Sequence, residues 1–175
     1  MWGLRQSVNN HEIDRKVRAA QASITSLSIF VVLSVAMIGL LVSQTSVEFG
    51  YNATVVSAGY LTFAIVLFLV ALEFFVLCIY RCEHIDWFGF RASCLYGFGA
   101  MCMVVGISVS LLAFGIRALS IVFLSAASVG YLGYYTVRIW KLGREDPFKT
   151  RMLFRGVSLL LLVIGFVFVT TLGGE

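Results

Sequence analysis

The chain has 175 residues, of which 60% are hydrophobic and only 13% are charged, and its mean hydropathy is +0.96. A soluble domain carries about 25% charged residues, so the composition excludes a water-soluble globular protein and indicates a multi-pass integral membrane protein. The net charge of +4 is carried by basic residues that flank apolar runs. Membrane topology accounts for basic residues in such places, and we therefore expect no nucleic acid partner.

Five apolar runs are each long enough to cross a hydrocarbon core of about 30 Å, which needs about 20 helical residues. We predict an all-α bundle of five transmembrane helices in residues 23–175, preceded by a cytoplasmic helical arm in residues 1–22. Because only three residues separate the third run from the fourth, four crossings with one long tilted or re-entrant segment is the alternative. The predicted spans are residues 23–43, 55–80, 93–115, 118–140 and 152–172.

The positions of the basic residues predict the orientation of the chain. Five crossings place 12 of the 13 Lys and Arg residues on one side of the membrane and leave Arg117 alone on the other side. Cytoplasmic flanks carry the excess of positive residues. We therefore expect the N-terminus in the cytoplasm and the C-terminus outside, and the uneven distribution supports five crossings over four.

The predicted arm ends in a segment that has the composition of a helix start. Asn9 can cap a helix, and Glu12 three residues later can complete a capping box. We expect the helix to begin at Asn9 and to continue directly into the first span.

Small residues predict where the spans pack, because helices in lipid associate through close backbone approach. The third and fourth spans both carry such residues and are joined by a very short turn, so we expect them to form a close antiparallel pair. The glycines predicted to pack are Gly39 in the first span, Gly99 and Gly106 in the third, and Gly130 and Gly133 in the fourth.

Glu73 lies within the apolar run of the second span, about 12 Å from Arg81 at 1.5 Å per helical residue. A charge near the centre of a bilayer costs about 2.5 kcal/mol or more, so Glu73 must be paired, neutralised or used. We expect a buried ion pair with Arg155 of the fifth span; the alternative is a protonated Glu73 that hydrogen-bonds to Tyr96 or Tyr134. The functional interpretation is that Glu73 lines a pathway for a cation or proton.

A second polar cluster occupies the end of the fourth span, where Tyr131, Tyr134 and Tyr135 precede Arg138. These residues could line an inward-facing vestibule or contact a lipid headgroup. The alternative interpretation is an interfacial aromatic and basic belt that ends at Trp140.

Motifs of enzymes and of cofactor sites do not occur in this sequence. The stretch CIYRCEHID, residues 78–86, holds residue types that can bind metals, but its spacing matches no zinc pattern, and both histidines lie in the predicted cytoplasmic flanks. A phosphate-binding loop, a Gly-x-Ser-x-Gly elbow and a His-Glu-x-x-His pair do not occur. We expect no metal, no cofactor and no enzyme activity.

Two functions fit a small polytopic protein of this kind. The first is a homo-oligomeric channel or transporter for an ion or small solute, with Glu73 near the pathway. The second is a non-catalytic subunit or scaffold that packs against other membrane subunits through its small residues, and a membrane-embedded enzyme is a distant third. The expected partners are the lipid bilayer and either further copies of the chain or other membrane subunits.

Overall fold

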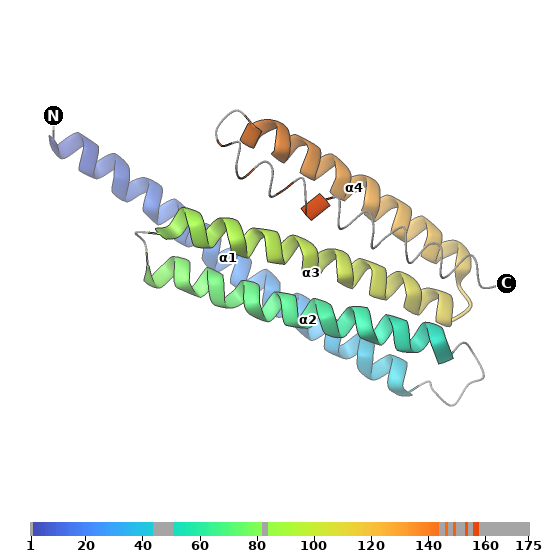
Figure 1. Cartoon of the computed structure of the whole chain (residues 1–175). Coiled ribbons are helices and arrows are strands. Elements are labelled where there is room, and N and C mark those ends of the chain that lie inside the picture. Colours follow the sequence, from blue (N-terminus) through green and yellow to red (C-terminus); the bar gives the residue numbers. More distant parts are fainter. Residues whose placement is uncertain are drawn as a thin grey trace.

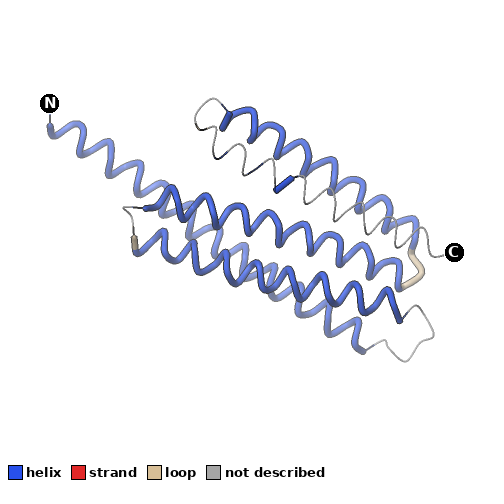
Figure 2. The backbone as a smooth tube through the Cα atoms, in the orientation of Figure 1, coloured by secondary structure: helices blue, strands red, loops and turns tan. Residues whose placement is uncertain are grey.

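In the computed structural model, the residues that can be described are 2–43, 51–81 and 84–143, together with Asp146, Lys149, Leu153, Gly156 and Val157. Side chains are described from residue 13 onward, except at residues 51, 52, 135, 142 and 143. Almost all of these residues are helical, and no strand occurs among them (Figure 2). The long helices are α1 (Trp2–Ser43), α2 (Tyr51–Tyr80), α3 (Ile85–Ala113) and α4 (Arg117–Gly143).

Each of the four helices is long and apolar enough to cross a membrane. The qualifying segments are Ile13–Ser43, Ala53–Tyr80, Ile85–Ala113 and Arg117–Lys141. The prediction of apolar helices at the first four runs is therefore confirmed. The fifth predicted span, residues 152–172, lies outside the described residues except for Leu153, Gly156 and Val157.

A tight turn at Gly115 separates α3 from α4. Gly115 has a φ of +77°, in the left-handed region that favours glycine. The backbone N–H of Gly115 donates to the Leu112 carbonyl at 2.9 Å, and that of Ile116 donates to the Leu111 carbonyl at 2.9 Å. These bonds satisfy carbonyls at the end of α3 and stop the helix. The two apolar runs therefore form separate, antiparallel helices rather than one long segment (Figure 1).

Helix α1 is continuous from the N-terminal arm into the apolar segment, and its 42 residues extend past the neighbouring helices (Figure 1). The helix begins at Trp2, so the prediction that it starts at Asn9 is wrong. No proline or glycine stands between Leu4 and Ile38 to interrupt the helix. The capping residues therefore lie inside a helix that continues through them.

The buried faces of α1 and α2 follow a repeat of seven residues. On α1, buried positions recur every seven residues, and on α2 they recur at alternating steps of three and four. This spacing lets two helices pack along a continuous seam at a shallow crossing angle. The buried residues are Ala20, Leu27, Ser34 and Leu41 on α1, and Ser57, Leu61, Ala64, Phe68, Ala71, Phe75 and Cys78 on α2.

Helix α3 is the centre of the bundle and shares its most extensive interface with α2. In the most apolar 18-residue stretch of α3, 56% of the residues are buried, whereas in the corresponding stretch of α4 only 12% are buried. Small residues along α3 allow this close approach. α3 and α4 are antiparallel, as predicted, and are in contact near the Gly115 turn, but the interface of α3 with α2 is more extensive.

Hydroxyl groups join α2, α3 and α4 near the Gly115 turn, which we call the far end of the bundle. The Ser57 hydroxyl lies 2.7 Å from the Gly106 carbonyl oxygen and 2.6 Å from the Ser110 hydroxyl. The Ser120 hydroxyl donates to the Ser108 carbonyl at 2.7 Å. Hydrogen bonds between helices substitute for water where the backbone is buried, so they hold the three helices together at this end.

Candidate functional site

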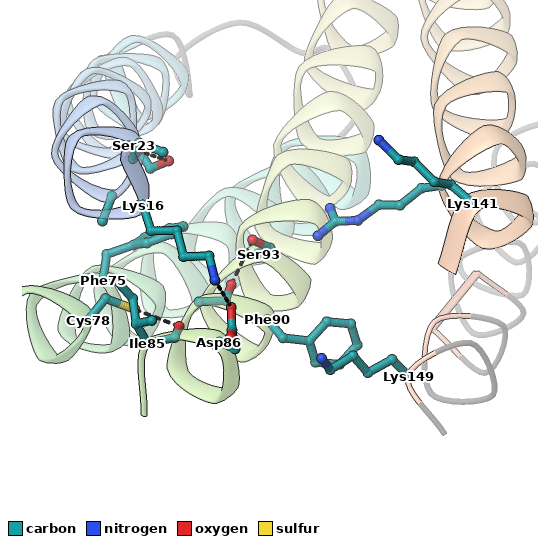
Figure 3. A pocket seen from close by; sticks show the side chains of 14 residues that line it. Lys16, Ser23, Phe75, Cys78, Ile85, Asp86, Phe90, Ser93, Lys141 and Lys149 are labelled. Atoms are coloured by element: carbon teal, nitrogen blue, oxygen red, sulfur yellow. Dashed lines mark hydrogen bonds and ion pairs between the residues drawn. The ribbon is translucent and has the colours of Figure 1, made fainter. Parts of the chain in front are cut away.

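A cavity of about 440 Å³ lies at the opposite end of the bundle, which we call the basic end (Figure 3). It opens where the start of the apolar part of α1, the end of α2, the start of α3 and the end of α4 come together. We call it the basic chamber. Its polar and charged lining residues are Lys16, Ser23, Asp86, Ser93, Arg138, Lys141 and Lys149.

Cations outnumber carboxylates among the described residues that line the basic chamber. Lys16 pairs with Asp86 at 2.9 Å, and Lys149 lies 3.6 Å from Asp146 (Figure 3 draws the first pair). Within the described part of the chain, neither Arg138 nor Lys141 has a carboxylate within 4.0 Å. The described lining residues therefore carry an excess of positive charge, which favours anions.

A second cavity of about 580 Å³ adjoins the first and lies deeper between α3 and α4. Four residues line both cavities, Ser23, Phe75, Ser93 and Arg138, so the two spaces are neighbours. Aromatic and small residues predominate in the second, and we call it the aromatic chamber. Its further lining residues are Tyr96, Gly97, Ala127, Gly130, Tyr131 and Tyr134.

Arg138 and Tyr134 connect the two chambers. The Arg138 guanidinium donates to the Tyr134 hydroxyl at 2.9 Å, and its central carbon lies 5.8 Å from the centroid of the Tyr134 ring. The residues are four apart, so they share one face of α4. Of the predicted cluster, Tyr131, Tyr134 and Arg138 thus line a cavity, whereas the side chain of Tyr135 lies outside the described residues.

Other helices contribute lining residues that the sequence analysis did not single out, among them Ser23 of α1, Phe75 of α2 and Ser93 of α3. One signal for the α4 wall is present in the sequence. From Ala127 to Lys141, cavity residues recur at steps of one, three or four, which is the spacing of one helix face. The lining residues of α3, from Ile85 to Gly97, and of α1, from Lys16 to Ser23, recur at the same steps, so each of these helices also presents one face to the cavities.

Glu73 lies on the exposed face of α2, away from the buried seam. Its neighbours on this face, Leu69, Val70 and Leu77, are also exposed. Glu73 is not among the described residues that line either chamber. Its predicted partner Arg155 lies outside the described residues, so the ion pair stays a prediction.

The glycines predicted to pack fall into two groups. A Cβ at Gly99 would lie 2.6 Å from the Phe68 ring, and one at Gly106 would lie 2.8 Å from Leu61 Cγ. These two glycines therefore allow α2 to approach α3. A Cβ at Gly39, Gly130 or Gly133 would have no atom within 4 Å, and Gly130 lines the aromatic chamber.

Metal-binding residue types stay dispersed in the described part of the chain. No three His, Cys, Asp or Glu side chains among the described residues lie close enough together to hold a metal ion. Cys78, Cys94 and Cys102 are free thiols. The chemistry that the described cavity residues offer is binding by charge, hydroxyl groups and aromatic rings.

Comparison with known proteins adds no assignment to this geometry. No protein-family model, curated protein or solved structure matches the chain.

Proposed function

We propose that this chain is a membrane transport protein, not an enzyme, that moves an ion or small solute and works as a homo-oligomer. In this proposal the chain crosses the membrane five times, with the N-terminus in the cytoplasm and the C-terminus outside. The uneven distribution of Lys and Arg along the sequence supports this topology.

The single observation that carries the proposal is the pair of adjoining chambers, which all four helices line. They begin at the basic end, among Lys16, Lys141 and Arg138, and continue inward past Ser93 to Tyr96 and Gly130. A solute that enters from the basic end would meet charged groups first and aromatic groups later. Cavities between helices with a few converging polar groups are where membrane proteins bind their substrates.

The far end of the same helix pair supports a carrier rather than an open pore. There, Ser120 of α4 donates to the Ser108 carbonyl of α3, and Leu124 packs against Val105 and Val109. The two helices are in contact at one end and separated by a cavity at the other. Carriers need this one-sided geometry, because alternating access exposes a site to one side of the membrane at a time.

Glu73 supports the oligomeric part of the proposal. A carboxylate on the outer face of α2, surrounded by exposed apolar side chains, would face lipid in a single copy. Lipid exposure of a charge at this depth costs about 2.5 kcal/mol or more. Contact between copies would cover Glu73 and place it near a pathway at the subunit boundary.

Flux through proteoliposomes that hold the purified protein tests the proposal. We expect wild type to conduct a small anion or cation above empty liposomes, and Arg138→Gln to alter that flux severalfold, while Arg81→Gln leaves it unchanged. Arg81 is a matched control, because it is exposed at the same end of the bundle and does not line the described cavities. Glu73→Gln tests the subunit boundary and is compared at acidic and alkaline pH.

The alternative is a non-catalytic subunit or scaffold of a larger membrane complex. The open surfaces around Gly39 and Gly133 favour it, because a Cβ at either position would have no atom within 4 Å. Such surfaces allow a further helix to approach closely. Absence of flux from folded, correctly inserted protein would support this alternative and contradict transport by the chain alone.

A further inference from the structure

The two chambers differ in chemistry although they adjoin. The basic chamber carries Arg138 and Lys141, for which the described residues supply no carboxylate, and the aromatic chamber presents Phe75, Tyr96 and Tyr131. A ligand that fills both must have an anionic group at one end and an apolar group at the other.

We propose that the joined chambers bind an amphipathic phosphate ester, with its phosphate between Arg138 and Lys141 and its apolar group in the aromatic chamber. This inference rests on the proposed transport function and names the class of solute that the cavity takes. The same chemistry occurs in soluble aryl or alkyl phosphates and in anionic phospholipids, which are its two possible sources.

Arg138 has the geometry to hold an oxyanion. One N–H of its guanidinium donates to Tyr134, which fixes the side chain along the wall of the cavity. A guanidinium has several further N–H donors in a planar fork that matches two oxygens of a phosphate. Because Arg138 is partly buried, an anion beside it interacts more strongly than it would in bulk water.

Lys141 supplies the second charge. It lies on the same face of α4, three residues after Arg138, and its side chain extends from α4 toward the space between the helices (Figure 3). A flexible ammonium beside a rigid guanidinium can follow a phosphate as it enters or leaves. Basic pockets between transmembrane helices bind phosphate-bearing headgroups in this way.

The aromatic chamber provides room for the apolar group. Gly130 leaves its part of the wall open, because no atom lies within 4 Å of a Cβ placed there. The Tyr96 ring is held by the Phe30 and Phe68 rings, with centroids 5.9 and 6.2 Å away. A fixed aromatic wall opposite an open glycine favours a flat or chain-like apolar group.

Isothermal titration of the purified full-length protein tests this site directly. The soluble probes are naphthyl phosphate, naphthol and inorganic phosphate, and the lipid probes are phosphatidic acid and phosphatidylcholine in mixed micelles. We expect naphthyl phosphate, phosphatidic acid or both to bind at least about tenfold more tightly than inorganic phosphate, because only they fill the aromatic chamber. Which of the two binds identifies the soluble or the membrane source.

Two variants, each with a matched control, examine the two chambers separately. Lys141→Gln together with Arg138→Gln should weaken binding of the phosphate ester about tenfold or more, and Arg81→Gln should leave it unchanged. Gly130→Leu should weaken binding of the phosphate ester but not binding of inorganic phosphate. Gly133→Leu should change neither affinity, because Gly133 is equally open but does not line the cavity. If the double variant misfolds, Lys141→Gln alone serves as the test, because Lys141 is exposed and its substitution should not disturb the fold.

Two results would overturn the inference. One is equal affinity for inorganic phosphate and for both esters; the other is a loss in the double variant no greater than the loss in Arg81→Gln. Binding is measured without flux, so the two proposals fail in different experiments. Ester binding without flux would contradict transport and keep the site, whereas flux without ester binding would keep transport and remove this ligand.

Discussion

The two faces of α3 behave in opposite ways, although both pack against an apolar helix. Toward α2, Gly99 and Gly106 of α3 meet Phe68 and Leu61, and this interface is the most extensive one among α1 to α4. Toward α4, described contacts lie at the far end, and at the basic end described residues of both helices line the two chambers. The difference teaches that hydrophobicity alone does not determine where these helices touch, because it is high on both sides.

The chamber walls on the α4 side present polar and aromatic side chains. Tyr131, Tyr134 and Arg138 project from α4 where α3 presents Ser93 and Tyr96. Gly99 and Gly106, by contrast, let α2 approach α3. In our proposal, the α2–α3 interface is the structural part of the bundle and the α4 side is the part that binds the solute.

We expect the largest loss of stability from Gly99→Ala, which disrupts the interface between α2 and α3. The new methyl group would lie 2.6 Å from the Phe68 ring, which is fully buried and packed against Phe30 and Tyr96, so the ring would have to shift. Overpacking of this kind costs about 1–3 kcal/mol. Unfolding in mixed micelles of detergent and denaturant measures the loss.

Gly133→Ala is the matched control on the α4 side. No atom lies within 4 Å of a Cβ at Gly133, so we expect no loss and a gain of up to about 1 kcal/mol from helix propensity. Equal destabilisation by the two substitutions would contradict the distinction between the two faces.

We expect a smaller loss in the free energy of unfolding from Ser57→Ala at the far end than from Gly99→Ala. The substitution removes the hydroxyl that contacts the Gly106 carbonyl and the Ser110 hydroxyl. Hydrogen bonds between transmembrane helices contribute about 0.6 kcal/mol on average, and we expect a loss of about 1 kcal/mol for both contacts. Ser28→Ala, which removes only an exposed bond within α1, should change the free energy of unfolding much less.

We expect the smallest change in the free energy of unfolding from Lys16→Gln at the basic end. Lys16 pairs with Asp86 at 2.9 Å, but the Asp86 side chain is 70% exposed. Exposed ion pairs contribute little because water screens them, so the free energy of unfolding should fall by at most about 0.5 kcal/mol. Arg18→Gln, an exposed neighbour on α1, is the reference, and a loss above about 2 kcal/mol would show that the basic end is structural.

The sequence predicts the helices of this bundle better than it predicts their faces. Long apolar runs identify α1 to α4, and Gly115 marks the turn that separates α3 from α4. In a membrane helix, however, lipid-facing and helix-facing positions are equally apolar. The periodicity of hydrophobicity therefore does not show which face of the helix is buried. Leu61 and Leu69 of α2 illustrate this: the first is fully buried and the second is half exposed.

The candidate site was predictable only in part for a related reason. Tyr131, Tyr134 and Arg138 are conspicuous as polar residues on one helix, and they do line a cavity. Phe75 and Ser93 are ordinary residues of apolar helices, and only the packing of three helices brings them to the same space. Glu73 is the most conspicuous residue of α2, yet it lies on the exposed face of the helix. The sequence of α2 alone does not show which face is exposed.

Cysteine accessibility tests most directly whether the α4 side of α3 is an open, water-filled path and the α2 side is sealed. Ser93→Cys and Ala92→Cys are compared in a background without the four native cysteines. The two positions have the same depth, about 10 Å from the start of α3, but Ser93 lines both chambers and Ala92 is fully buried. A charged, membrane-impermeant thiol reagent should modify Ser93→Cys much faster than Ala92→Cys. Equal, slow modification of both would show that water does not reach the chambers and would contradict a pathway on this side of α3.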